Sequence, residues 1–140
     1  MPKVFLGGTV NGSKWREYVK PRLEIDYFDP VVDDWNDEAY QRELHEREHS
    51  EFCLYVITPK MTGVYSIAEV IDDSNKRPEK TLFCYLLKDE EDFFTEFQAK
   101  SLAAVGKMVV RNGGQSFTDL TNLIEYLNLH KEIESDVFTG

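Results

Sequence analysis

Residues 52–57, Phe-Cys-Leu-Tyr-Val-Ile, are the segment that most narrows the fold of this chain. They are apolar at both alternating positions, which is typical of a strand in the middle of a parallel sheet with helices on both faces. Thr58-Pro59 ends the run. The next segment predicts a helix that faces the core, with Thr62 as its N-cap and apolar residues at helical spacing: Val64, Ile67, Ala68 and Ile71. A central strand followed by such a helix indicates an α/β fold.

The same alternation of strand and helix patterns continues along the chain. Strand-like runs occupy residues 4–6, 25–28, 81–87 and 115–117. A first helix begins after Asn11 or Ser13 and extends to Leu23, and further helical patterns cover about residues 37–50, 93–111 and 119–129. Because crossovers between parallel strands are right-handed, the pattern favours a flavodoxin-like three-layer sandwich with a five-stranded parallel sheet of order 2-1-3-4-5. A length of 140 residues predicts a single domain over residues 1–140.

The charge of the chain limits its partners. Sixteen Lys and Arg against 26 Asp and Glu give a net charge of −10 at pH 7, which repels polyphosphates and anionic lipids. We therefore expect neither a nucleic acid polymer nor a membrane surface as a partner. The sequence has no apolar run of the roughly 18 residues that a bilayer requires and no signal-peptide pattern. Cys53 and Cys84 lie in apolar runs, as free buried thiols do. These features predict a cytoplasmic protein.

Two loops are expected to form a ligand site. In a flavodoxin-like sheet, ligands bind beyond the carboxyl ends of the strands, between the first and third strands. Residues 7–13 and 58–69 should meet there. The first loop contains Gly7, Gly8, Asn11 and Ser13, and its backbone N–H groups and hydroxyl could hold a small polar ligand. The alternative is a tight turn that needs glycine for its backbone conformation alone.

Glu69 is the candidate catalytic residue. It follows the central strand and lies in the first or second turn of the predicted helix, one position away from the apolar stripe. The helix dipole favours its ionised form, which suits a nucleophile at neutral pH. The alternative is that Glu69 only complements the dipole of the helix.

An acidic and aromatic loop at residues 29–35 is a candidate for recognition of a base or a sugar. Its carboxylates Asp29, Asp33 and Asp34 could accept hydrogen bonds while the ring of Trp35 stacks on the ligand. The alternative is that Asp33 or Asp34 caps the next helix and that Trp35 covers the edge of the core.

The segment from His45 to His49 matches the zinc-protease patterns HExxH and HxxEH. Its flanks are polar, however, and the strand at residues 52–57 begins almost at once. His130 is the only other histidine, and no third-ligand motif follows. A solvated helix face explains these residues better than a zinc site, so we expect no metal and no cofactor.

Three blocks of sequence resemble the nucleoside 2-deoxyribosyltransferase-like proteins. They are residues 4–16 (VFLGGTVNGSKWR), 28–35 (FDPVVDDW) and 54–70 (LYVITPKMTGVYSIAEV), and the resemblance extends over about residues 4–87. It implies a flavodoxin-like fold and cleavage of the N-glycosidic bond of a 2′-deoxynucleoside or its 5′-monophosphate. In this family the nucleophilic glutamate lies on the helix after the third strand, where Glu69 matches it. Its carboxylate would form a covalent deoxyribosyl-enzyme, which a second base or water would resolve.

The resemblance also implies roles for the loops and an oligomeric assembly. Gly7, Gly8, Asn11 and Ser13 would contact sugar or phosphate, the loop at residues 29–35 would contact base and sugar, and the chain would form a homo-oligomer.

The chain departs from the family at two positions. Gly63 stands where characterised transferases have an aspartate, and Phe5 or Leu6 stands where they have a tyrosine. Asp33, Asp34 or Tyr65 would then have to protonate the departing base. The departures leave a noncatalytic nucleotide-binding module as the main alternative, with a zinc protein behind it.

Overall fold

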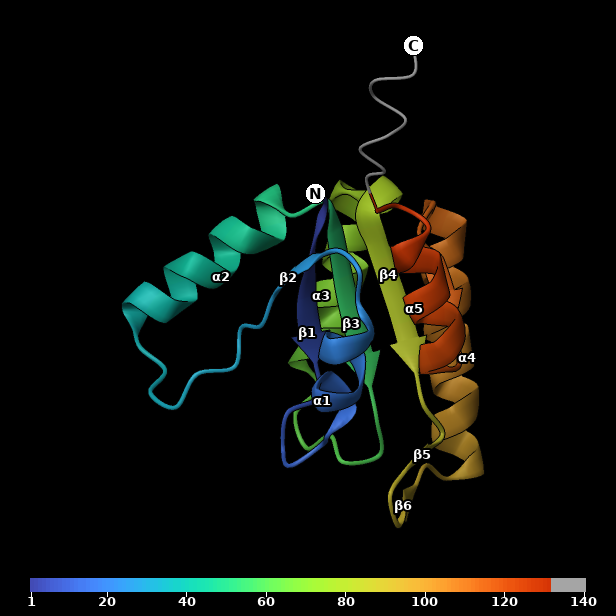
Figure 1. Ribbon diagram of the computed structural model, residues 1–140. Helices are drawn as coiled ribbons and strands as arrows, with labels where there is room; N and C mark the ends of the chain where they lie inside the picture. The colour runs from blue at the N-terminus through green and yellow to red at the C-terminus, as the bar shows by residue number, and fades with distance from the viewer. Residues whose placement is uncertain (132–140) are drawn as a thin grey trace.

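The computed structural model describes residues 1–131. One sheet of five parallel strands has the order β2-β1-β3-β4-β7, and helices cover both of its faces (Figure 1). This architecture confirms the flavodoxin-like sandwich. The sheet strands are β1 (Lys3–Gly8), β2 (Asp26–Phe28), β3 (Phe52–Ile57), β4 (Thr81–Tyr85) and β7 (Gln115–Phe117).

Alternation along the central strands divides the core into two halves. Val4, Leu54 and Leu82 point to one face, where they pack with side chains of α1 (Trp15–Val19) and α5 (Leu120–Asn128). Phe5 and Phe83 point to the other face, where α3 (Tyr65–Lys76) and α4 (Glu96–Asn112) cover them. Strand β3 is buried along its whole length, because it pairs with β1 on one edge and with β4 on the other.

The helices around the first crossover differ in detail from the prediction. Helix α1 does not extend to Leu23, because Pro21 converts its end into a 3-10 turn, η1 (Lys20–Arg22). Helix α3 begins after Val64, and the predicted cap Thr62 is wrong. The Thr62 hydroxyl instead accepts a hydrogen bond of 2.7 Å from the Asn11 side chain. A second 3-10 turn, η2 (Pro78–Lys80), follows α3.

The predicted apolar stripe of α3 is also only partly correct. Val64 is 69% exposed, and Ile67 and Ile71 are only partly buried against the core. The fully covered face of the helix comprises Glu69, Val70, Asp73 and Ser74. It is polar because a charged side chain from α2 (Asp37–His49) lies against it.

Residues 88–93 form an antiparallel hairpin of β5 (Lys88–Asp89) and β6 (Asp92–Phe93) that the sequence patterns did not predict. The fourth strand therefore ends at Tyr85 instead of continuing to residue 87, and the helix predicted from residue 93 begins at Glu96. Thr95 and Gln98 form a capping box at that point, which fixes the start of α4. Asp119 caps α5, so the last predicted helix is confirmed within one residue at each end.

Cys53 and Cys84 are buried free thiols, as predicted. Burial raises the pKa of each to about 12, so both remain protonated and unreactive at neutral pH. Within residues 1–131, the helices are too short or too polar to cross a membrane.

Candidate functional site

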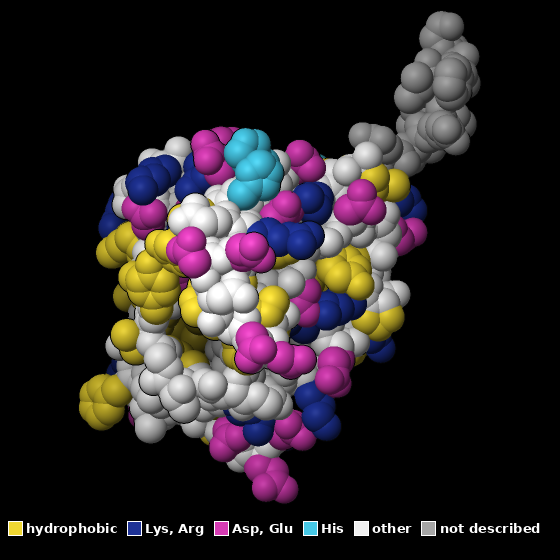
Figure 2. Space-filling model, turned by 90° about the vertical axis from the view of Figure 1, so that its left-hand side faces the viewer, with side chains coloured by type: hydrophobic (Ala, Val, Ile, Leu, Met, Phe, Trp, Pro, Cys, Tyr) yellow, Lys and Arg dark blue, Asp and Glu magenta, His cyan; other side chains and the backbone are white. Residues whose placement is uncertain are grey.

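A cavity of about 250 Å³ lies at the carboxyl end of β1, where the strand order reverses between β1 and β3. We call it the Glu69 cavity. Its wall is formed by β1 with the loop after it, α1, the loop at residues 30–35, α2 and α3. Figure 2 shows the face of the molecule that carries α2. The lining residues are Phe5, Gly7, Gly8, Val10, Arg16, Pro30, Val31, Val32, Trp35, Glu43, Ser66 and Glu69.

A second cavity of about 210 Å³ adjoins the first and shares Gly8, Val10 and Ser66 with it. Asn11 and Tyr65, both predicted site residues, line this second cavity. The ring of Tyr65 is 68% exposed. Together the two cavities reach the range of roughly 300–1,000 Å³ in which small-molecule sites fall.

The two glycines of β1 are needed for close packing as well as for the cavity. A Cβ atom on Gly8 would lie 2.1 Å from the carbonyl oxygen of Val56, and the φ of Gly8 is +120°. A Cβ atom on Gly7 would lie 2.9 Å from the rings of Phe5 and Tyr55. Both glycines thus lie in a strand instead of a tight turn: Gly8 is needed for its positive φ, Gly7 only for close packing, and their bare backbone also forms part of the cavity wall.

Asn11 and Ser13 connect the first loop to other loops. The Asn11 amide donates to the Thr62 hydroxyl at 2.7 Å and to the Lys60 carbonyl oxygen at 3.4 Å. The Ser13 hydroxyl donates to Asp89 in the hairpin at 2.5 Å. Loops 7–13 and 58–69 thus meet as predicted, and the hairpin is a third partner.

Glu69 lies in the second turn of α3 and is 8% exposed. Arg47 of α2 approaches it, with Nη1 3.2 Å from Oε2 of the carboxylate. Burial nevertheless raises the pKa of Glu69 to about 7. The effect of burial therefore outweighs that of Arg47 and opposes the preference for the ionised form that was expected from the helix dipole.

Glu43 is a site residue that sequence reasoning missed. Its side chain lines the same cavity as Glu69, and its negative charge raises the pKa of Glu69 further, after burial as the largest cause. A nearby like charge favours the protonated form of a buried carboxyl group such as Glu69. A signal was present in the sequence: Glu43 and Arg47 are four residues apart and occupy one face of a helix that has few apolar residues.

Arg47 holds α2 against α3 through a buried ionic network. Its Nη2 lies 3.0 Å from Oδ1 of Asp73, a carboxylate with no exposed surface. Asp73 also accepts a hydrogen bond of 2.5 Å from the Tyr55 hydroxyl and pairs with Arg77 at 3.2 Å. Each charge that is removed from water is therefore matched by an opposite charge or a hydrogen bond.

Arg16 forms part of the cavity wall, and its guanidinium is occupied there by hydrogen-bond and ion-pair partners. Its guanidinium donates to the backbone carbonyl oxygens of Leu6, Gly8 and Thr9. Its Nε lies 3.5 Å from Asp29, which also pairs with Lys20. Asp29 thus anchors the end of β2 to α1. Burial lowers the pKa of Arg16 to about 10, so the guanidinium of Arg16 remains charged at neutral pH.

The structure separates the other residues of the acidic loop. Trp35 lines the Glu69 cavity, is 56% exposed and contacts the ring of Tyr40 edge-on. Asp33 and Asp34 are exposed and line neither cavity. They do not cap α2 either, because the Asn36 side chain accepts the hydrogen bond from the first turn.

The histidines of the HExxH match lie on the exposed face of α2. The rings of His45 and His49 stack with their centroids 4.1 Å apart, and Nδ1 of His49 lies 2.8 Å from the His45 carbonyl oxygen. Within residues 1–131, no group of three potential metal ligands comes together. Both histidines are exposed, as a solvated helix face requires.

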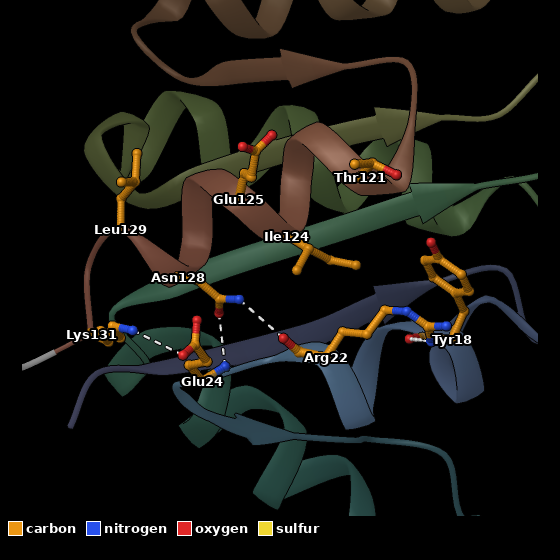
Figure 3. A pocket seen from close by; sticks show the side chains of 9 residues that line it. All are labelled: Tyr18, Arg22, Glu24, Thr121, Ile124, Glu125, Asn128, Leu129 and Lys131. Carbon is orange, nitrogen blue, oxygen red and sulfur yellow. Dashed lines mark hydrogen bonds and ion pairs between the residues drawn. The ribbon is translucent and has the colours of Figure 1, made fainter.

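A larger hollow of about 580 Å³ lies on the opposite side of the sheet, between α1, η1 and α5 (Figure 3). Its polar groups are occupied with each other: Asn128 binds the backbone of Arg22 and of Glu24, and Lys131 pairs with the Glu24 carboxylate. It has no pair of interacting acids and lies away from the carboxyl ends of the strands. We therefore place the candidate site at the Glu69 cavity.

The fold and the cavity define a flavodoxin-like α/β protein with a cavity lined by two acids at the switch point of its sheet. A sequence model of the family described as "nucleoside 2-deoxyribosyltransferase like" matches residues 1–84. The chain belongs to this family. A search of curated proteins found no match.

Proposed function

We propose that this protein cleaves the N-glycosidic bond of 2′-deoxynucleosides or their 5′-monophosphates and transfers the deoxyribosyl group to a second base or to water. The observation that carries the proposal is that two carboxyl groups, those of Glu43 and Glu69, line the same cavity. Double displacement at an anomeric carbon needs one carboxylate as nucleophile and one carboxylic acid as proton donor.

The two acids have different roles in this mechanism. The carboxylate of Glu69 attacks C1′ of the sugar, and the C1′–N bond breaks with its electron pair going to the base. Glu43 gives its proton to the departing base, a role for which the sequence suggested Asp33, Asp34 or Tyr65. In the second step a new base or water attacks C1′, the Glu69 carboxylate leaves, and the proton released by the nucleophile returns to Glu43.

Arg47 supports both roles without touching the substrate. Its guanidinium stabilises the ionised form of Glu69, and its position on α2, one turn after Glu43, fixes the distance between the two acids. The backbone of Gly7 and Gly8 and the ring of Trp35 complete the wall of the cavity, where an aromatic face suits stacking with a base.

The test is base release followed by chromatography, with each deoxynucleoside and its monophosphate, with and without an acceptor base. Glu69→Gln should reduce turnover to the background rate. Glu43→Gln should lower kcat by about 10²–10⁴-fold for a natural base. It should lower kcat much less for a deoxyriboside whose acidic leaving group departs without a proton. Glu48→Gln, an exposed acid on the same helix, is the matched control.

The same experiment separates enzyme from binding module. Ligand-dependent thermal stabilisation without any product, equal in the wild type and in Glu69→Gln, would favour a noncatalytic nucleotide-binding module. Turnover that is unchanged in Glu69→Gln would refute the assignment of the nucleophile.

We also propose that the chain forms a homo-oligomer through the surface beside the Glu69 cavity. Exposed apolar side chains gather there on the loop before α2 and on α2 itself: Val31, Val32, Trp35, Tyr40 and Leu44. Such a cluster is typical of an interaction surface. Light scattering coupled to size-exclusion chromatography should report a mass above 16.3 kDa, and Leu44→Glu should lower it.

A further inference from the structure

The β5–β6 hairpin lies outside the residues that match the family and is strongly acidic. The family match ends at residue 84, and residues 89–92 are Asp-Glu-Glu-Asp. The hairpin lies at the same end of the sheet as the loops that follow β1 and β3 (Figure 1). It therefore adds negative charge to the rim of the proposed site.

The hairpin pairs with polar groups of these two loops that flank the cavities without lining them. Asp89 accepts a hydrogen bond of 2.5 Å from the Ser13 hydroxyl. The Lys60 ammonium donates to Asp92 at 2.9 Å and lies 3.5 Å from Glu90. These hydrogen bonds, that of Asp92 first, raise the pKa of Lys60, so it stays charged but paired.

The cations in the cavity wall and beside Glu69 are paired as well. Arg16 is the one cation among the described residues that line the two cavities, and it is held by three backbone carbonyl oxygens and by Asp29. Arg47 is shared between Glu69 and Asp73. A phosphate group in the cavity would therefore meet two acids in its wall and one cation, Arg16, that is already paired.

We propose that the β5–β6 hairpin is a specificity element that makes the site accept an uncharged 2′-deoxynucleoside and reject its 5′-monophosphate. The proposal rests on the function proposed above and names the substrate class within it. The hairpin acts by pairing with Lys60 and Ser13, so that no net positive charge faces the ligand. Discrimination of this kind works by repulsion of the wrong ligand more than by attraction of the right one.

The experiment compares kcat/KM for a deoxynucleoside and its 5′-monophosphate in the wild type and in the double variant Glu90→Gln with Asp92→Asn. We expect the wild type to prefer the deoxynucleoside at least tenfold. The double variant releases Lys60 and should reduce this preference about fivefold or more, chiefly by raising kcat/KM for the monophosphate. Glu79→Gln with Glu125→Gln removes the same number of charges from exposed acids elsewhere and should leave the preference unchanged.

A third variant tests whether Lys60 mediates the effect. Lys60→Met leaves Glu90 and Asp92 without their cation, so it should raise the preference of the otherwise wild-type protein for the deoxynucleoside, and it should reduce the gain in the double variant. A wild type that prefers the monophosphate, or a double variant with an unchanged preference and normal far-UV circular dichroism, overturns the proposal and leaves the proposed function intact.

Binding measurements keep the test independent of turnover. In the Glu69→Gln background, the deoxynucleoside should raise Tm, whereas its monophosphate and inorganic phosphate should not. The hairpin variant should restore the shift with the monophosphate. If neither turnover nor a Tm shift occurs with any of these ligands, the proposed function fails and this inference fails with it.

Discussion

Replacing Glu69 by Gln should change the way in which the stability of the protein depends on pH. The pKa of this group is raised from 4.5 to about 7 by burial. The folded state therefore holds the proton more tightly than the unfolded state. The stability that this group contributes is fully present below about pH 4.5 and is lost as the pH rises to about 7.

The magnitude follows from the size of the shift. At about 1.36 kcal/mol per pKa unit, ionising Glu69 in the folded state costs at most ~3 kcal/mol. Solvent at the mouth of the cavity screens part of this cost, which leaves about 1–2 kcal/mol. Gln does not titrate, so only the wild type loses this stability as the pH rises. The difference in the free energy of unfolding, Glu69→Gln minus wild type, should therefore rise by this amount between pH 4.5 and pH 7.5.

Urea unfolding at half-unit pH steps, monitored by circular dichroism, measures this difference. Glu79→Gln, an exposed acid for comparison, should give a difference that is nearly independent of pH. A flat difference for Glu69→Gln, or one that falls as the pH rises, would refute the argument that burial dominates the environment of Glu69.

Four further substitutions test the packing and the ionic network. Gly8→Ala should lower the free energy of unfolding by at least ~3 kcal/mol, because its Cβ would overlap the Val56 carbonyl oxygen at a φ of +120°. Urea unfolding measures this loss. A loss below about 1 kcal/mol would contradict so close an approach of β1 to β3. Arg47→Met should cost about 3–5 kcal/mol by the same assay, because it breaks the buried pair with Asp73, and the acidic limb of the pH–rate profile should move to higher pH. Phe83→Ala, in the core, should cost about 3–5 kcal/mol, whereas Phe97→Ala, which is 82% exposed, should stay within about 0.5 kcal/mol.

The sheet was largely predictable because its strands are buried on both faces. A strand such as Phe52–Ile57, with helices above and below, must be apolar at every position, and its bounds matched the prediction. The hairpin was not predictable in the same way. Its strands are two residues long, and its turn places Glu90 at a φ of 56°, which is a conformation that the glutamate side chain does not signal.

The position of Glu69 was predictable from topology, whereas its surroundings were not. The switch point of the sheet and the helix after β3 indicate where Glu69 lies. Its partners come from α2, whose sequence is that of a solvated helix: Tyr40 and Leu44 remain exposed in the structure. No apolar pattern could show which face of α2 packs against the protein, because charged side chains make that contact.

The ionic attachment of α2 links its position to the chemistry of the site. Arg47 pairs with Glu69 and Asp73, Glu46 pairs with Lys3, and Arg42 lies over the ring of Phe28. Helix α2 is thus held to the sheet mainly through charged side chains, and it contributes Glu43 to the cavity. Its presence shields Glu69 from water, which raises the pKa, while its Arg47 opposes that shift. Because one helix supplies the shielding, the balancing cation and the second acid, any movement of α2 away from α3 would hydrate Glu69, lower its pKa and remove the proposed proton donor at the same time.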